Sequence, residues 1–383
     1  MDAFFVEVER LRRPELRGKA VVVGGAGRRG VVASASYEAR SRGVTSGMPI
    51  GQARRLCPHA VVVPPDHAAY TTVSRQVFEV IEGFTPRVEV VSVDEAFIDI
   101  GGLRLLHPSP LEVGARIRAA LREEVGLPAS IGLATTKLLA KMASRDAKPD
   151  GMFLVAAGTE RAYLHPKAVR SLWGVGEATY ARLEELGVRT VGDLADFPRA
   201  GLVKRLGGAL GGHLWDLASG RDQREVTRQG ETRSVSVEQT YDVDITDTNQ
   251  LHRELLAHAD RLASRLRSNG FVAERVQLKV RYDDFTTVTR SRTFTAPVST
   301  GRDIYRAAVA LLDRTAAGAR PVRLLGIGAD GLVAAVDPRQ LDLAPRSWDD
   351  LEEVVEEGRG RFGRNAVARA RLVDPAPDHP RDD

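Results

Sequence analysis

The spacing of apolar residues changes twice along this chain, and this change limits the possible folds more than any other feature. Up to about residue 155, short β-type runs such as 20–23 alternate with helical stretches such as 68–83 and 110–125, which predicts strands and helices around one sheet. Residues 156–225 show helical spacing only, and strands and helices mix again from 236 to 336. We therefore predict an α/β multidomain protein with a helical domain in its middle.

Length and charge narrow the class of protein. A chain of 383 residues is long enough for about two to four domains. The last 43 residues carry 11 acidic residues and 7 arginines, so the net charge of +4 for the whole chain leaves +8 on residues 1–340. A basic body with an acidic tail suits a polyanionic partner such as nucleic acid.

Three absences indicate where the protein works. The single cysteine, Cys57, excludes an internal disulfide framework and a zinc site built from several cysteines. No apolar run reaches the length of about 18 residues that a membrane span requires. Acidic residues near the start argue against a signal peptide. We expect a cytoplasmic protein with no membrane partner.

Asp94 and Glu95 are the first candidates for chemistry. They are adjacent acids between two β-type runs, at 87–93 and 96–100, and no Gly or Pro marks the joint between the runs. One interpretation is a solvated strand tip. The other is a carboxylate pair for a divalent cation, because Mg²⁺ prefers hard oxygen ligands and a nucleotide substrate adds its own phosphate oxygens.

Gly174 and Gly176 lie in the string LWGVGEATYARLEELGV, which predicts a helix, a short glycine turn and a second helix. Glycine lets a backbone approach a phosphate, and the helix that follows offers free N–H groups. An ordinary helix joint is the alternative, but the whole string indicates a helix–hairpin–helix unit that binds nucleic acid. A nuclease or glycosylase of this type would need a catalytic Lys or acid beside the string, and we find none.

A cluster of lysines follows. Lys137, Lys141 and Lys148 are three of the seven lysines in the chain. The first two share one helix face at i, i+4 spacing, and a solvated face is the simpler interpretation for Lys137. Lys148 lies in AKPDG, where a turn could fix its charge against a phosphate.

Strand residues near the end of the chain are also basic. In the strand at 274–285, Lys279 lies on the face opposite the apolar side chains. Arg290 and Arg292 share one face of the next run at period 2. This spacing suits contact with a phosphate backbone, or an ordinary exposed face.

Taken together, these strings resemble a known family. The order DAFFVEVE, VVASASYEARSRGV, MPIGQARRLCP, SVDEAFID, SIGLATTKLLAKMAS, AKPDG, LWGVGEATYARLEELGV, RYDDFTTVTRSRTF and VRLLGIG is similar to that of the Y-family (translesion) DNA polymerases, of the bacterial polymerase IV type. The resemblance runs from residue 1 to about 336. It implies a right-hand polymerase fold with palm, fingers, a helix–hairpin–helix thumb and an α+β little-finger domain.

The resemblance also implies domain boundaries. They are residues 1–8 and 66–155 for the palm, 9–65 for the fingers, 156–225 for the thumb, 226–231 for a linker, 232–336 for the little finger and 337–383 for a tail.

The implied activity is template-directed, low-fidelity DNA synthesis from dNTPs, used in DNA repair and damage tolerance. Its substrates are primer–template DNA and dNTPs, and its cofactor is Mg²⁺, as two ions. By this resemblance Asp94 binds the catalytic Mg²⁺, Glu95 is the active-site acid beside it, and Met1 lends its backbone carbonyl. Phe5 matches the steric-gate aromatic that excludes a ribose 2′-OH, and Phe4 lies under the incoming sugar.

Further positions carry over by the same resemblance. The triphosphate is expected to meet Ser34, Tyr37, Arg40 and Lys148. The residues expected to contact DNA are Gly174, Gly176, Lys279, Arg290 and Arg292. Gln340-Leu341-Asp342-Leu343 directly follows the little finger and resembles the sliding-clamp binding peptide of bacterial polymerases, so Gln340, Leu341 and Leu343 are expected to bind the clamp. We expect a monomer.

The start of the chain departs from the family pattern. The family has two Asp residues in its first palm strand, and the first of them bridges both metal ions. Here Met1-Asp2-Ala3-Phe4-Phe5 keeps only the second, as Asp2. A free α-amino group at Met1, with an ordinary pKa of about 7.7–8.0, would oppose metal binding when charged.

Two explanations fit this departure. One is a true start upstream, which is the explanation we expect because the other motif residues are intact. The alternative is a catalytically impaired or non-catalytic DNA-binding partner in a clamp-associated repair complex.

Overall fold

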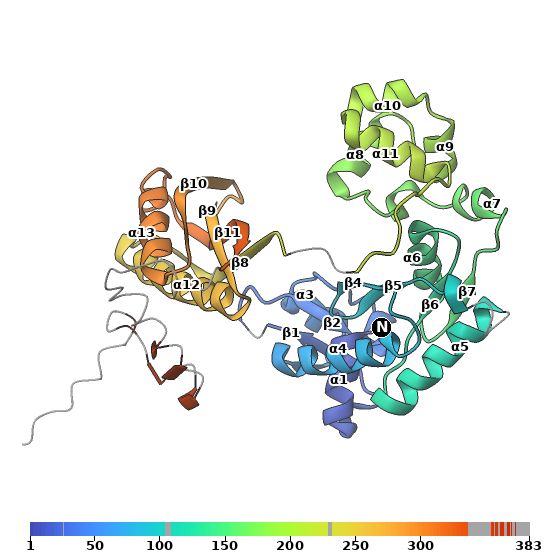
Figure 1. Ribbon diagram of the computed structural model, residues 1–383, viewed down its shortest axis with the longest axis horizontal. Helices are drawn as coiled ribbons and strands as arrows, with labels where there is room; N and C mark the ends of the chain where they lie inside the picture. The colour runs from blue at the N-terminus through green and yellow to red at the C-terminus, as the bar shows by residue number, and fades with distance from the viewer. Residues whose placement is uncertain are drawn as a thin grey trace, which may run out of the picture. The chain divides into compact units, whose positions relative to one another are not determined.

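The structure is a computed structural model, and it describes residues 1–25, 27–103, 109–228 and 232–335, with a few residues between 354 and 372. The chain divides into two compact units. The first is Met1–Ala26 with Gly30–Gly230, and the second is Gly27–Arg29 with Glu231–Asp383. Figure 1 labels the helices and strands of both units.

Among the described residues, the strands of the first unit form three small sheets, with the orders β2-β1-β3, β4-β5 and β6-β7. Their bounds are β1 (Val21–Gly24), β2 (Val32–Ala35), β3 (Val61–Val63), β4 (Val88–Ser92), β5 (Glu95–Ile98), β6 (Ile131–Leu133) and β7 (Met152–Leu154). The prediction of one sheet is therefore wrong. Apolar patterns predict that strands exist but not which strands pair. Register shifts at Val23/Gly24 and Val90/Ser92 also interrupt two of the ladders.

Helices surround these sheets. Their bounds are α1 (Phe4–Arg12), α2 (Tyr37–Arg40), α3 (Ile50–Leu56), α4 (His67–Glu82), α5 (Pro110–Ala120), which continues as the π-type turn Leu121–Val125, and α6 (Lys137–Asp146). The helices expected at 68–83, 110–125 and 135–146 are confirmed. One core lies beneath α1, α4 and α5, and it contains Phe4, Val6, Val8, Val77, Ile81, Val113 and Ile117.

The position of α6 matters for the site described below. The side chain of Thr136 caps its start by accepting from the Leu139 N–H. Strand β6 lies so close to α6 that a Cβ at Gly132 would come within 2.1 Å of the Ala140 carbonyl oxygen. A glycine at this position therefore holds the helix tightly against the strand.

The middle of the chain is helical, as the spacing predicts. Its helices are α7 (Glu160–Leu164), α8 (Glu177–Glu185), α9 (Val191–Asp196), α10 (Arg199–Leu206) and α11 (Gly208–Ala218). Their apolar faces share a buried core that also takes Leu138 and Leu139 from α6. Gly174 has a φ of +100°, which only glycine adopts easily, in the turn before α8.

The second unit is an antiparallel sheet of order β10-β9-β11-β8, with two helices packed on one face (Figure 1). The elements are β8 (Ser234–Ile245), α12 (Thr248–Ser268), β9 (Phe271–Tyr282), β10 (Thr287–Val298), α13 (Gly301–Leu312) and β11 (Val322–Ala334). On β9, Val276, Leu278, Val280 and Tyr282 are all buried in the core beneath these helices. The predicted alternation on this strand is confirmed.

The predicted clamp-binding residues Gln340, Leu341 and Leu343 lie outside the described residues. Among the helices that the structure does describe, none is long and apolar enough to cross a membrane.

Candidate active site

Asp94 and Glu95 lie at the turn between β4 and β5. The turn closes without glycine because the Ser92 hydroxyl accepts from the Asp94 N–H at 3.3 Å and donates to Asp94 Oδ1 at 2.8 Å. The Glu95 side chain is 45% exposed, and Lys141 Nζ lies 2.7 Å from its Oε2. The two acids are thus a fixed pair with one cation already beside them.

Met1 and Lys148 lie next to this pair. The Met1 amino nitrogen donates to the Asp94 carbonyl oxygen at 2.6 Å, and Lys148 Nζ donates to the Met1 carbonyl oxygen at 2.9 Å. A cleft of about 1440 Å³ is lined by Met1, Asp94, Glu95, Lys141 and Lys148, among others. The structure therefore brings together four of the predicted residues, Met1, Asp94, Glu95 and Lys148.

Opposing effects act on the pKa of Glu95. Burial raises this pKa, but the hydrogen bond and charge of Lys141, with the charges of Lys148 and the amino terminus, outweigh burial. The net shift lowers the pKa of Glu95 below its ordinary value, so this carboxylate stays ionised at neutral pH.

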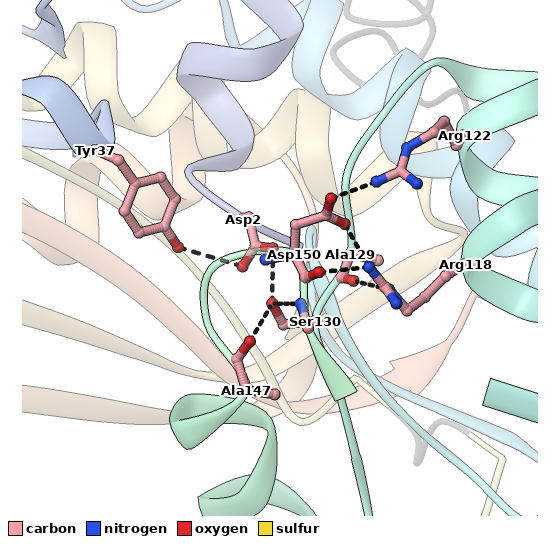
Figure 2. A network of polar contacts seen from close by, with 9 residues as sticks. Asp2, Tyr37, Arg118, Arg122, Ala129, Ser130, Ala147 and Asp150 are labelled. Atoms are coloured by element: carbon pink, nitrogen blue, oxygen red, sulfur yellow. Dashed lines mark hydrogen bonds and ion pairs between the residues drawn. The ribbon is translucent and has the colours of Figure 1, made fainter. Parts of the chain in front are cut away.

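Behind the cleft, Asp2 is almost fully buried, with 2% of its surface exposed. Its Oδ2 accepts from the Ser130 hydroxyl and from the Asp150 N–H, each at 2.7 Å. Its Oδ1 lies 3.7 Å from Lys148 Nζ and 3.4 Å from the Tyr37 hydroxyl. Figure 2 shows this network without Lys148, with Tyr37 reaching Asp2 from one side and the Asp150 turn from the other.

The predicted triphosphate residues of the 34–40 segment lie along β2 and α2. Ser34 is buried in β2, and Tyr37 and Arg40 come from α2. Arg40 donates from Nε to the Ala35 carbonyl oxygen at 2.9 Å and covers the Tyr37 ring at 5.1 Å. Burial, followed by the negative charge of Asp2, raises the pKa of Tyr37 to about 12, so its hydroxyl remains a proton donor.

The predicted sugar-contacting aromatics begin α1. Phe4 is buried in the core, whereas Phe5 is partly exposed and stacks on Tyr70 with ring centres 4.3 Å apart. The Tyr70 hydroxyl is held in turn by the buried Glu9 at 2.7 Å. The Phe5 ring therefore has a rigid backing.

The solvated position expected for Lys137 is wrong. Lys137 is 8% exposed, and its ammonium lies 2.5 Å from Glu89 Oε1. It also donates to the Glu225 carbonyl oxygen at 3.2 Å, while Glu89 accepts from the Thr227 N–H at 2.9 Å. The i, i+4 spacing identifies a shared helix face but not the segments that cover it. Here β4 and residues 225–227 cover Lys137.

Sequence comparison places the chain in a family. The impB/mucB/samB family matches residues 1–145, its C-terminal domain matches 232–343, and a thumb domain described as that of DNA polymerase iota matches 170–222. A DNA polymerase IV of Streptomyces coelicolor is 48% identical over 93% of this chain and 74% of its own length. The chain belongs to the Y-family DNA polymerases, in the polymerase IV group.

Other relatives agree. A DNA polymerase IV of Halorhodospira halophila is 43% identical over 87% of this chain and 93% of its own length. Among solved structures, a Y-family DNA polymerase chimera of Dbh and Dpo4 has a TM-score of 0.80 at 25% identity, covering 87% of this chain and 97% of that one. An insertion ternary complex of Dbh DNA polymerase, at 24% identity and a TM-score of 0.63, shares the fold. The right-hand fold with a helix–hairpin–helix thumb and a little-finger domain is thereby confirmed.

Mg²⁺ fits the donors of this polymerase site when the substrate is counted. Within the described part of the chain, no three His, Cys, Asp or Glu residues gather to hold a metal ion. Two carboxylates and a backbone carbonyl remain, on Asp94, Glu95 and Met1, and all three are hard oxygen donors. Proteins often hold Mg²⁺ through one or two carboxylates plus substrate phosphates. The residues present therefore fit a Mg²⁺ whose remaining ligands come from the substrate phosphates, and not a site in which the protein supplies every ligand.

The thumb of this polymerase meets the site through Trp173. Its ring packs 5.6 Å from the Phe97 ring and lies 5.3 Å from Lys141 Nζ. Gly174 and Gly176 follow directly, and Gly176 is the N-cap of α8. A Cβ at Gly176 would meet no atom within 4 Å, so the backbone is open on that side.

The basic residues of the little finger lie on two faces of its sheet. Arg290 pairs with Leu278 across the ladder and Arg292 with Val276. Because directly paired residues share a face, both arginines lie on the helix-covered face, at the edge strand β10. Lys279 lies on the open face, where it bridges to Glu238 at 2.8 Å. The two arginines do face one way, as predicted, but not the way that Lys279 faces.

Sequence reasoning missed Ser130 and Asp150 as partners of Asp2, and Lys141 as the partner of Glu95. Asp2 and Ser130 are 128 residues apart, and Lys141 and Glu95 are 46 apart. No spacing rule links such positions. The AKPDG turn was a usable signal for Asp150, since it predicts a fixed backbone at that residue.

Proposed function

We propose that this chain catalyses template-directed DNA synthesis by nucleotidyl transfer from dNTPs, of the low-fidelity translesion type used in DNA repair and damage tolerance. The observation that carries the proposal is the shared cleft of Asp94, Glu95 and Lys148. Family membership supports it, and the comparisons give the non-catalytic alternative no support.

The chemistry that this site must supply is charge placement. Phosphoryl transfer depends on in-line positioning and neutralisation of phosphate charge more than on covalent catalysis. Mg²⁺, when bound, would supply positive charge beside the reacting phosphate. Asp94, Glu95 and the Met1 carbonyl would hold the Mg²⁺. By analogy with the family, two ions would bind here.

The substrate is proposed to lie between this pair and the fingers. Lys148, Tyr37, Arg40 and Ser34 are assigned to the triphosphate as proton donors and positive charges. Phe5, backed by Tyr70, is assigned to the sugar, where a rigid ring would collide with a 2′-OH. Phe4, which is buried in the core, is assigned a place under the incoming sugar.

The remaining assignments concern partners. Gly174, Gly176, Lys279, Arg290 and Arg292 are proposed to contact primer–template DNA. Clamp binding through Gln340, Leu341 and Leu343, the monomeric state, the cytoplasmic location and the domain boundaries stay predictions.

Primer extension with Mg²⁺ and dNTPs tests the proposal. The chain should extend a primer, and Asp94→Ala should lower the rate by at least about 10²–10³-fold, the usual loss for one preorganised electrostatic group. The Kd for primer–template should stay within about twofold, because Asp94 contributes no positive charge to phosphate binding. Glu15→Ala, an exposed acid in the turn Pro14–Leu16, is the control and should leave the rate unchanged.

Two results would contradict the proposal. One is full activity in Asp94→Ala. The other is failure to extend a primer both by this chain and by a version preceded by the family's first palm strand. Extension only by the longer version would show that the activity requires that strand and would leave the proposed reaction type standing.

A further inference from the structure

Asp2 is a buried carboxylate that has no task in the reaction as described so far. We propose that Asp2 is a positioning residue for the incoming triphosphate: its carboxylate holds the Lys148 ammonium and the Tyr37 hydroxyl in place from two separate parts of the chain. The inference rests on the proposed function, because it takes the contact between Lys148 and the triphosphate as given.

The two oxygens of Asp2 have different neighbours. Oδ2 accepts two short hydrogen bonds, from the Ser130 hydroxyl and the Asp150 N–H, each at 2.7 Å. Oδ1 faces Lys148 Nζ at 3.7 Å and the Tyr37 hydroxyl at 3.4 Å. The short bonds anchor the carboxylate, and the longer contacts reach the two groups assigned to substrate.

The anchor is itself held rigidly. Arg118 donates to Asp150 Oδ1 at 2.8 Å and to the Ala129 carbonyl oxygen at 2.9 Å, and Arg122 also bonds the Asp150 carboxylate. Figure 2 shows both arginines on the far side of the Asp150 turn from Asp2. The turn that carries Lys148 therefore cannot shift without breaking contacts to α5 and to the turn after it.

The charge of Asp2 explains why it is an acid and not an amide. A carboxylate with 2% exposure is costly to bury unless a positive group and hydrogen-bond donors compensate it. Lys148 is the ammonium beside it, and its second contact is the Met1 carbonyl oxygen at 2.9 Å. An ammonium has three donors, so Lys148 can keep both contacts and still offer one to a phosphate. Asp2 thus orients the Lys148 ammonium and still leaves one of its N–H donors for a phosphate.

The Tyr37 contact connects the same Asp2 carboxylate to the fingers. Tyr37 lies at the start of α2, 35 residues from Asp2, and its hydroxyl points at the same oxygen as Lys148. The Arg40 guanidinium lies over the same Tyr37 ring, 5.1 Å from its centre. One carboxylate oxygen therefore sets the spacing between a palm cation and a fingers hydroxyl, which is the spacing that a triphosphate would have to match.

Asp2→Asn is the sharpest test. The amide oxygen can still accept from Ser130 and Asp150, which leaves the amide NH₂ facing Lys148 and Tyr37, where it attracts neither a cation nor a donated proton. We expect the dNTP KM to rise about tenfold, comparable to Lys148→Met, with kcat and the primer–template Kd changed by less than about twofold. The double variant Asp2→Asn/Lys148→Met should lose clearly less than the product of the two single losses, because both changes remove the same Asp2–Lys148 interaction and only the Tyr37 contact is lost through Asp2→Asn alone.

A matched control makes the same chemical change at another carboxylate that lines the cleft and is bonded to Arg224 and Leu138, not to a residue assigned to the triphosphate. Asp222 has a side chain that is 1% exposed, and it accepts from the Leu138 N–H at 2.9 Å in the same unit. Asp222→Asn should leave the dNTP KM unchanged. Melting temperatures of all variants check that they are folded. If Asp2→Asn does not fold, Ser130→Ala carries the test, because it loosens Oδ2 without removing the charge. It should raise the dNTP KM about two- to threefold.

The outcomes separate this inference from the proposed function. If Lys148→Met raises the dNTP KM but a folded Asp2→Asn, or Ser130→Ala, leaves it unchanged, the inference is overturned. Fully additive losses in the double variant would also overturn it, since Asp2 would then act independently of Lys148. An unchanged KM in Lys148→Met would remove the triphosphate role of that lysine, and the inference with it, while primer extension itself remained.

Discussion

The active-site region of the first unit and the open sheet face of the second treat charged side chains differently. In the first unit, Asp2 and Lys137 are buried and each is paired with segments distant in sequence. In the second, Lys279 and Glu238 pair across the open face of a sheet, with side chains 31% and 37% exposed. Buried, paired charges are fixed in place, which catalysis requires. Exposed charges contribute through their total number, and salt screens them, which suits electrostatic binding of a polyanion.

The largest single effect on stability should come from a buried pair of the first unit. Lys137→Met leaves the Glu89 carboxylate, whose side chain is 21% exposed, without its cation. Breaking a fully buried pair from one side costs about 3–5 kcal/mol, so we expect this partly buried pair to cost about 2–3 kcal/mol. Thermal and denaturant unfolding should show this loss. Lys141→Met is the matched control, because its partner Glu95 is 45% exposed. Its cost should be about 1 kcal/mol or less.

A double change sharpens the same prediction. Replacing both members with apolar side chains, as in Lys137→Met with Glu89→Leu, should recover much of the lost stability, because no uncompensated charge remains buried. If the stability lost in the double variant equalled the sum of the losses in Lys137→Met and Glu89→Leu, the ion pair would not be the source of the loss.

His258 tests this comparison, because it is a fully buried titratable group in the second unit. Its ring nitrogens have no hydrogen-bond partner among the residues that the structure describes. Burial, with a smaller effect from the charge of Arg261, lowers the pKa of His258 from 6.5 to about 4. A folded-state pKa below the unfolded value means that protonation favours unfolding.

The sign of the pH effect follows directly. The second unit should keep its full stability above about pH 6.5 and lose about 1.4 kcal/mol per pH unit as the pH falls from about 6.5 towards 4. His258→Leu should remove this dependence in that range, which unfolding experiments at several pH values would measure. An equally steep pH dependence in the variant would assign the effect to other groups.

The same contrast explains what the sequence could predict. The period-2 pattern at 276–282 places four apolar side chains on one face, and the structure buries all four. Local patterns also predict the β4–β5 turn that carries Asp94 and Glu95, because each strand has its own apolar run. The sheet of the second unit is built from such long local patterns.

The first unit could not be predicted in the same way. Its strands are three to five residues long, which is too short for a pattern to specify partners. The pairing of Lys137 with Glu89 spans 48 positions, and helical spacing says nothing about what covers a face. For Arg290 and Arg292, period 2 gave a common face, but only the ladder register showed that this face is the helix-covered one.

The smallest effects should come from the open face of the second unit. Lys279→Gln should weaken primer–template binding by about two- to threefold and lower the salt slope of log K by at most about 0.9, the value for one phosphate contact. Its ion pair with Glu238 already takes part of its charge. Glu238→Gln should therefore act in the opposite direction and tighten binding by a similar factor, because it frees Lys279 for phosphate. Fluorescence anisotropy at several salt concentrations measures both variants. Weaker binding in Glu238→Gln would mean that Glu238 is needed to hold Lys279 in place, and the second unit would then depend on fixed charges as the first does.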